Sequence, residues 1–183
     1  MKKVLREELR KPSEYAETRE NFRRSVMAQK DLRRVHVGGY LTFLFENHDT
    51  VLYQIQEMIR AENITGDTEI RHEMDTYNEL LGDKGELGCT LLIEIEDPAK
   101  RPELLARWQN LPSTLYIETQ GGTRIAAKFD ERQVGDDRIS SVQYLKFPIG
   151  DQVPRKIGCR HPEISAETLL SPEQTAALCQ DLL

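Results

Sequence analysis

The side chains best suited to chemistry lie in one short stretch, from Phe45 to Glu62. There, carboxylates, an imidazole, amides and a guanidinium follow the end of an expected strand and accompany the start of a helix. The free N–H groups at a helix N-terminus attract anions. We therefore predict a ligand site where a hairpin over residues 33–46 meets a helix that starts near Thr50. The side chains expected to form this site are Arg33, Arg34, His36, Glu46, His48, Glu57, Arg60 and Glu62.

The helix that starts near Thr50 has two opposite faces. Its apolar stripe comprises Val51, Leu52, Ile55, Met58 and Ile59. Polar side chains, among them Gln56, Glu57 and Arg60, lie on the other side. They either face solvent, with contacts at helical spacing, or line a groove that another element covers. Glu62 projects into the apolar arc, where a carboxylate needs a partner or water, and Arg19 is the candidate partner.

Two histidines accompany this helix. His36 and Glu46 share one face of the expected hairpin, and His48 lies in the loop before the helix. Each histidine alone is more typical of a surface or hydrogen-bonded residue. Together with Arg33 and Arg34 they predict a cationic edge that could hold a small anion.

A second cluster has the spacing of metal ligands. His72, Asp75 and Glu79 occupy one face of a single helix. A metal site in a helical bundle needs ligands that project inward, whereas Ile70 and Leu81 place the buried face on the opposite side. Solvent exposure is therefore the favoured interpretation of this trio, and a metal site is the weaker one.

The sequence has no motif for nucleophilic catalysis or nucleotide binding. The sequence contains no Gly-x-Ser-x-Gly elbow, phosphate loop or dinucleotide fingerprint. Cys159 and His161 are too close in sequence to face each other as a usual catalytic pair. Cys89, Cys159 and Cys179 are widely spaced, which predicts reduced thiols. No cofactor is expected, apart from the metal alternative.

Charge is unevenly distributed along the chain. Residues 1–34 contain 11 Lys and Arg against 6 Asp and Glu, while the other residues contain 14 against 25. The net charge of −6 argues against general nucleic-acid binding. The basic segment is expected to be a solvated helix, or a surface that binds an acidic partner or a second copy.

The length of 183 residues predicts one domain. Apolar runs are too short for a membrane-spanning helix, and no signal-peptide pattern follows Met1. We expect a cytoplasmic protein with a basic helical segment over residues 1–32, a core over 33–147, and an irregular tail over 148–183 that ends in a short helix.

Periodicity predicts the elements. A helix is expected from Ser13 to about Asp31, and a hairpin follows with Gly38 and Gly39 in its turn. A three-residue loop would pair Val35 with Phe43 and keep apolar side chains on one face, so we predict that register over a two-residue turn.

The later segments complete an α+β fold. Asp49 and Asp67 are expected to cap two helices, which end near Glu62 and Leu81 and pack on a mainly antiparallel sheet. The remaining expected elements are a strand over 87–96, a short helix over 98–111, a three-stranded meander over 114–119, 123–129 and 139–147, and a helix beginning at Ser171–Gln174.

Several separated segments together resemble the bacterial domain-of-unknown-function family numbered 3501. The likeness is carried by residues 33–38, 45–47, 54–62 and 77–80, and extends from the first helix to Phe147–Pro148. The resemblance implies that genes of this family frequently lie next to genes for rubrerythrin-like proteins and iron-sulfur oxidoreductases. It implies no role for any residue.

Two functions are therefore expected. The first is an accessory protein that docks with a redox partner of the rubrerythrin or iron-sulfur oxidoreductase type. The alternative is an enzyme or binding protein for a small anion or metal, with its site at the hairpin–helix junction. The scarcity of cysteines argues against an iron-sulfur centre in this chain.

Overall fold

A computed structural model describes residues 1–183, with the exception of the Arg132 side chain. Its described α-helices are α1 (Pro12–Asp31), α2 (His48–Ala61), α3 (Asp67–Asn78), α4 (Arg101–Arg107) and α5 (Pro172–Asp181). Three short 3-10 helices are η1 (Arg6–Glu8), η2 (Leu111–Thr114) and η3 (Glu131–Gln133). The strands are β1 (Arg34–Val37), β2 (Leu41–Phe45), β3 (Leu87–Ile93), β4 (Leu115–Thr119), β5 (Arg124–Ala126), β6 (Lys128–Phe129), β7 (Val142–Phe147), β8 (Pro154–Cys159) and β9 (Ala166–Leu169). The predicted α+β class is confirmed.

The strands form two antiparallel sheets. The first has the order β1-β2-β3-β7-β6 and the second the order β5-β4-β8-β9. Their margins meet, because the Thr168 hydroxyl donates to the His36 carbonyl (2.5 Å) beside β1, and the Ala127 N–H donates to Leu115 O (3.0 Å) between β5 and β6. Together the sheets enclose the larger apolar core, which contains Phe43, Leu91 and Trp108.

The register of the first hairpin follows the prediction. Val35 pairs with Phe43, and Val37 pairs with Leu41. Gly38 has a φ of 62° in the connecting turn, a conformation that glycine adopts without strain. All four paired side chains are buried. The alternation of apolar residues therefore determines which residues face the core.

The later strands differ from the prediction. The expected meander does not form, because β4 and β5 belong to the second sheet while β6 and β7 belong to the first. The segment after Pro148 is not an irregular tail: it supplies β8 and β9, and β8 is the inner partner of β4. Gly158 on β8 lies under the ring of Tyr116, so a Cβ there would lie 2.4 Å from that ring.

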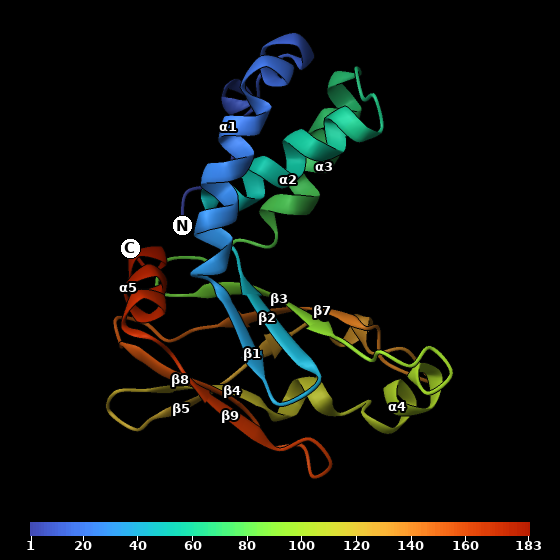
Figure 1. The fold of residues 1–183 in the computed structure, drawn as a ribbon, viewed down its shortest axis with the longest axis vertical. Helices are drawn as coiled ribbons and strands as arrows, with labels where there is room; N and C mark the ends of the chain where they lie inside the picture. The colour runs from blue at the N-terminus through green and yellow to red at the C-terminus, as the bar shows by residue number, and fades with distance from the viewer.

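Three helices form a lobe of their own. Figure 1 shows α1, α2 and α3 extending away from one end of the strands, whereas α5 lies beside that end. A separate apolar cluster holds this helical lobe together, and it includes Val4, Val51, Ile55 and Ile70. The expected packing of helices on the sheet is thus limited to the junction at the base of the lobe.

Helix starts differ in detail from the expected caps. Asn47, not Asp49, caps α2: its side chain accepts from the Thr50 N–H (2.9 Å), and the Thr50 hydroxyl accepts from the Asn47 N–H (2.9 Å). This reciprocal pair satisfies two otherwise free donors. Gly66 precedes α3, and Lys11 precedes α1 with Pro12 as its first helical residue.

The chain crosses between the lobe and the strands at what we call the neck: residues 32–33, 46–50 and 80–88, together with Asp181. At the third crossing the backbone is tightly packed. A Cβ on Gly88 would lie 1.8 Å from the Leu80 carbonyl oxygen, and one on Gly82 would lie 2.0 Å from the Glu86 carbonyl oxygen. Glycine is therefore required at both positions.

Among the described helices, none has both the length and the apolar character needed to cross a membrane.

Candidate functional site

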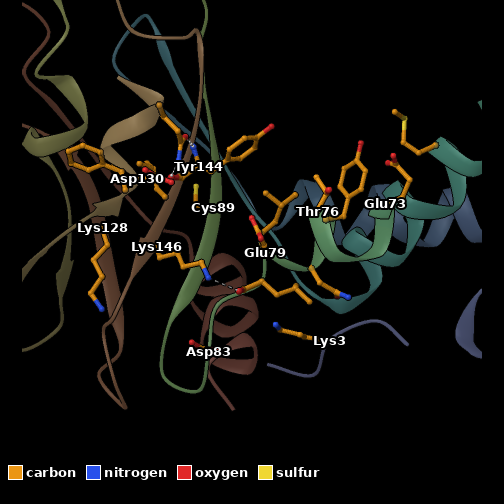
Figure 2. A pocket seen from close by; sticks show the side chains of 18 residues that line it. Lys3, Glu73, Thr76, Glu79, Asp83, Cys89, Lys128, Asp130, Tyr144 and Lys146 are labelled. Atoms are coloured by element: carbon orange, nitrogen blue, oxygen red, sulfur yellow. Dashed lines mark hydrogen bonds between the residues drawn. The ribbon is translucent and has the colours of Figure 1, made fainter. Parts of the chain in front are cut away.

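A groove of about 750 Å³ lies between the helical lobe and the first sheet. We call it the interlobe groove. Figure 2 shows its two walls: Glu73, Thr76 and Glu79 on the side of α3, and Lys128, Tyr144 and Lys146 on the side of β6 and β7. The other lining residues include Lys3, Met58, Tyr77, Leu80, Asp83, Cys89, Phe129, Asp130 and Leu145.

The sheet wall is built by strand alternation. On β7, Leu145 and Phe147 face the core, so Tyr144 and Lys146 face outward. Tyr144 is 48% exposed and projects from β7 toward α3. An aromatic ring left half in solvent beside a hollow is available to pack against a ligand.

Lys146 connects the sheet wall with the neck. Its ammonium donates to the Leu81 carbonyl oxygen (3.2 Å) and lies 3.9 Å from Glu86 Oε1. Lys128 lies 3.5 Å from the other oxygen of the same carboxylate. The two lysines thus share one acidic partner, and this part of the wall retains a positive charge.

The helical wall is acidic and carries an aromatic ring. Tyr77 is half-buried, and this burial raises the pKa of its hydroxyl, with a further increase from the nearby charge of Glu73. The phenol is therefore neutral near pH 7 and can donate a hydrogen bond. Glu79 is exposed at the end of α3.

The predicted site at the hairpin–helix junction is divided among several places. Arg33 is buried and clamps Asp181 through two hydrogen bonds of 2.7 and 2.8 Å. Burial raises the pKa of Asp181, an effect that Arg33 opposes. Arg34 is exposed, and its carbonyl accepts from the Gln174 side chain (2.9 Å). Arg33 therefore forms a buried ion pair in the neck, whereas Arg34 faces solvent.

Glu46 belongs to the neck as well. It is buried, and its carboxylate accepts from the hydroxyl of Thr50 (2.6 Å) and from the side chains of Gln54 (3.0 Å) and Thr90 (3.4 Å). These donors come from α2 and β3. Glu46 thus holds the start of α2 against the sheet.

The two histidines lie apart. His36 Nδ1 is 2.8 Å from the Thr42 hydroxyl, which donates to Glu94 (2.5 Å), toward the hairpin turn. His48 Nε2 is 3.2 Å from a Glu8 oxygen at the start of α2. The hydrogen bond from Lys2 is the main cause that lowers the pKa of Glu8 to about 2. The structure does not bring the imidazoles to one anion site.

Part of the polar face of α2 is covered by α1, but as paired side chains rather than as the lining of a groove, so neither expected arrangement holds in full. Arg19 donates twice to Glu57 (both 2.8 Å), and the Tyr15 hydroxyl donates to Glu57 (2.6 Å). These bonds lower the pKa of Glu57, Arg19 being the main cause. Polar groups therefore satisfy one another between the two helices. Arg60 is exposed.

The expectations for Glu62 and the metal trio can also be compared with the structure. Glu62 is exposed at the end of α2, and the partner of Arg19 is Glu57 rather than Glu62. His72, Asp75 and Glu79 are all exposed, and the described residues contain no group of three or more ligands that could hold a metal ion. Of the trio, Glu79 lines the interlobe groove.

Sequence reasoning missed the groove because its walls come from residues 73–83 and 128–146. One signal was present: Tyr144 occupies an outward position of an alternating strand, between Gln143 and Leu145. A large aromatic side chain on the solvent face of a strand is a candidate for binding. The partner wall could be known only from the fold.

The fold and the groove define a class: an α+β domain in which a three-helix lobe stands on two joined antiparallel sheets. The model of the DUF3501 family, described as proteins of unknown function, matches residues 3–182. The chain therefore belongs to this family, and the match extends beyond the expected end at Phe147–Pro148.

A solved structure is similar over its whole length. It is a protein of unknown function from Burkholderia pseudomallei, with 30% sequence identity, complete coverage of both chains and a TM-score of 0.90. The similarity includes both lobes, as expected for one domain. No curated protein matches the chain.

Proposed function

We propose that the protein binds a small organic molecule in the interlobe groove. The groove supports this proposal because its volume of about 750 Å³ is within the range of known ligand sites, roughly 300–1,000 Å³. It also combines apolar, aromatic and charged side chains. The observation that carries the proposal is the exposed side chain of Tyr144, which lines the groove and projects from β7 toward α3.

A pair of matched variants tests this proposal. Thr76 and Thr68 are both exposed residues of α3, but only Thr76 lines the groove. Thr76→Trp should fill the groove, whereas Thr68→Trp should place the same indole outside it. A library of small organic compounds would be screened by amide chemical-shift changes in the wild-type protein, and each hit titrated into both variants.

We expect hits that shift amides of α3, β6 and β7, with affinity reduced at least about tenfold in Thr76→Trp and unchanged in Thr68→Trp. Thermal melting would first establish that both variants are folded. The proposal is contradicted if no compound binds, or if Thr76→Trp binds all hits like the wild type.

The second candidate is the expected role as an accessory protein of a redox system, in a bacterial cytoplasm. The observation that favours it is the exposure of α1, which has only Tyr15 and Val26 buried. However, Arg6, Arg19 and Arg33 pair with Asp67, Glu57 and Asp181, so part of the basic excess is used within the chain.

The docking surface would therefore consist of the remaining cations of α1, of which Arg23 and Arg24 are exposed. Association through such charges is screened by salt. A pull-down with an iron-sulfur oxidoreductase or a rubrerythrin-like protein should recover the partner at low salt and lose it at high salt. Absence of capture at low salt would refute this candidate.

A further inference from the structure

Charged side chains of opposite sign line the interlobe groove from its two walls, and Lys3, Asp83 and Asp130 line it as well. Glu73 and Glu79 lie on the helical wall, and Lys128 and Lys146 lie on the sheet wall (Figure 2). Neither Glu73 nor Glu79 has an ion-pair partner among the described side chains. The carboxylates of Glu73 and Glu79 can therefore pair with a cationic group of a ligand.

The sheet wall contains two lysines that are only partly neutralised by their shared partner. Lys128 and Lys146 share the single carboxylate of Glu86, at 3.5 and 3.9 Å, so these three groups together carry one positive charge. Asp130 lies on the same wall but is already engaged with another group. An anionic group that enters the groove would therefore be attracted to the lysines.

Apolar and aromatic side chains also line the groove. Met58, Tyr77 and Leu80 contribute from the helical side, and Tyr144 contributes from the sheet side. A ligand with an apolar body would bury its surface against these side chains. Charges of both signs at its two ends would match the two walls.

We propose that the ligand is zwitterionic, of the amino-acid or short-peptide class, with its ammonium toward Glu73 and Glu79 and its carboxylate toward Lys128 and Lys146. This inference rests on the proposed function of the groove. An extended dipeptide separates its terminal charges by roughly 7 Å, and each added residue increases this span by about 3.5 Å. The volume of the groove admits such short peptides.

Three probes that share the same dipeptide core test whether binding requires both terminal charges. They are the dipeptide phenylalanyl-leucine, its N-acetyl derivative, which lacks the ammonium, and its C-terminal amide, which lacks the carboxylate. Titration calorimetry at pH 6.5 keeps the α-amino group protonated, since its pKa is about 7.7–8.0. We expect the zwitterion to bind about two- to fivefold more tightly than either derivative, as exposed ion pairs contribute modestly.

Two charge variants assign the ends. Glu79→Gln should weaken the binding of the dipeptide and of its amide, because both carry the ammonium. Binding of the acetyl derivative should be unchanged. Lys128→Gln should weaken the binding of the dipeptide and of its acetyl derivative, because both carry the carboxylate. Binding of the amide should be unchanged. Glu69→Gln is the control, because Glu69 is an exposed residue of α3 outside the groove.

The outcomes separate this inference from the proposed function. If either derivative binds as tightly as the dipeptide, the inference of a zwitterionic ligand is wrong, while the proposal that the groove binds a ligand stands. Binding of library compounds but of none of the three probes would do the same. If no compound of any kind binds, both proposals fail.

Discussion

Charged side chains at the base of the helical lobe satisfy one another instead of facing a ligand. Arg33 with Asp181, and Glu46 with Thr50, are buried and bonded across different elements. Removing one partner of such a set costs more than the bond itself contributes, because the other group is left desolvated and unpaired. These residues stabilise the fold, and the binding role that we propose is placed in the groove instead.

Glu57 offers a residue-scale prediction. Glu57→Gln should lower the free energy of unfolding at pH 7 by about 1–3 kcal/mol, because it weakens charge-assisted bonds from Arg19 and Tyr15. The pKa of Glu57 is lowered in the folded state from its ordinary 4.5. Its stabilisation is therefore present above pH 4.5 and is lost as the pH falls through the lowered pKa.

Denaturant unfolding of the wild type and Glu57→Gln between pH 7 and pH 3 would measure this effect. The difference between the two proteins should shrink toward acid pH. Glu17→Gln serves as the control, because Glu17 is an exposed residue of α1, and it should change stability by less than about 0.5 kcal/mol. A pH-independent difference for Glu57→Gln would contradict the electrostatic explanation.

The same residue shows the limit of sequence reasoning at this scale. The helical projection placed Gln56 and Glu57 correctly, opposite the apolar stripe of α2. It could not decide whether solvent or another segment covers them, because Arg19 of α1 and Arg10 in the segment before α1 approach from more than 30 residues away. Gln56 is 2% exposed, and its amide accepts from the Arg10 N–H (2.9 Å) and donates to the Arg10 carbonyl (3.1 Å).

Local pairing was predictable at the scale of elements, and distant pairing was not. The β1–β2 register followed from alternation and a turn of three residues. The strand β4, in contrast, pairs with β8, which begins 35 residues after β4 ends. Several antiparallel strands of similar composition could have filled that position, so the meander was only the simplest arrangement.

The third crossing of the neck gives the second prediction. Gly88→Ala should destabilise the protein by at least about 3 kcal/mol or prevent folding, because backbone atoms of Leu80 and Gly82 leave no room for a Cβ. Gly39→Ala is the matched control, since open space surrounds that position and its φ is not positive. It should change stability by no more than about 1 kcal/mol.

Thermal and denaturant unfolding of both glycine variants would measure the difference. If Gly88→Ala were as stable as Gly39→Ala, the backbone packing between residues 80 and 88 would be disproved.

The whole molecule consists of two apolar clusters joined through a polar neck. Asp181→Asn should weaken this connection, because it leaves the Arg33 guanidinium buried without its charged partner. We expect a loss of about 3 kcal/mol, near the lower limit for a broken buried ion pair. Asp67→Asn, which breaks the exposed pair with Arg6, should cost less than about 1 kcal/mol.

Hydrogen exchange resolved by segment would show where Asp181→Asn acts. Amides of α1, α2 and α5 should exchange faster, while those of β2, β3 and β7 keep most of their protection. Equal acceleration in every segment would mean that the two lobes open as one cooperative unit.

The short strands at the sheet margins have a consequence for assembly. The outermost strands β1, β5, β6 and β9 have four, three, two and four residues, and the two sheets contact each other along these margins. Short, covered margins give another chain little backbone to pair with, which protects a β-rich protein from amyloid-like aggregation. If two copies associate, we therefore expect side-chain contacts between helices rather than a continuous intermolecular sheet.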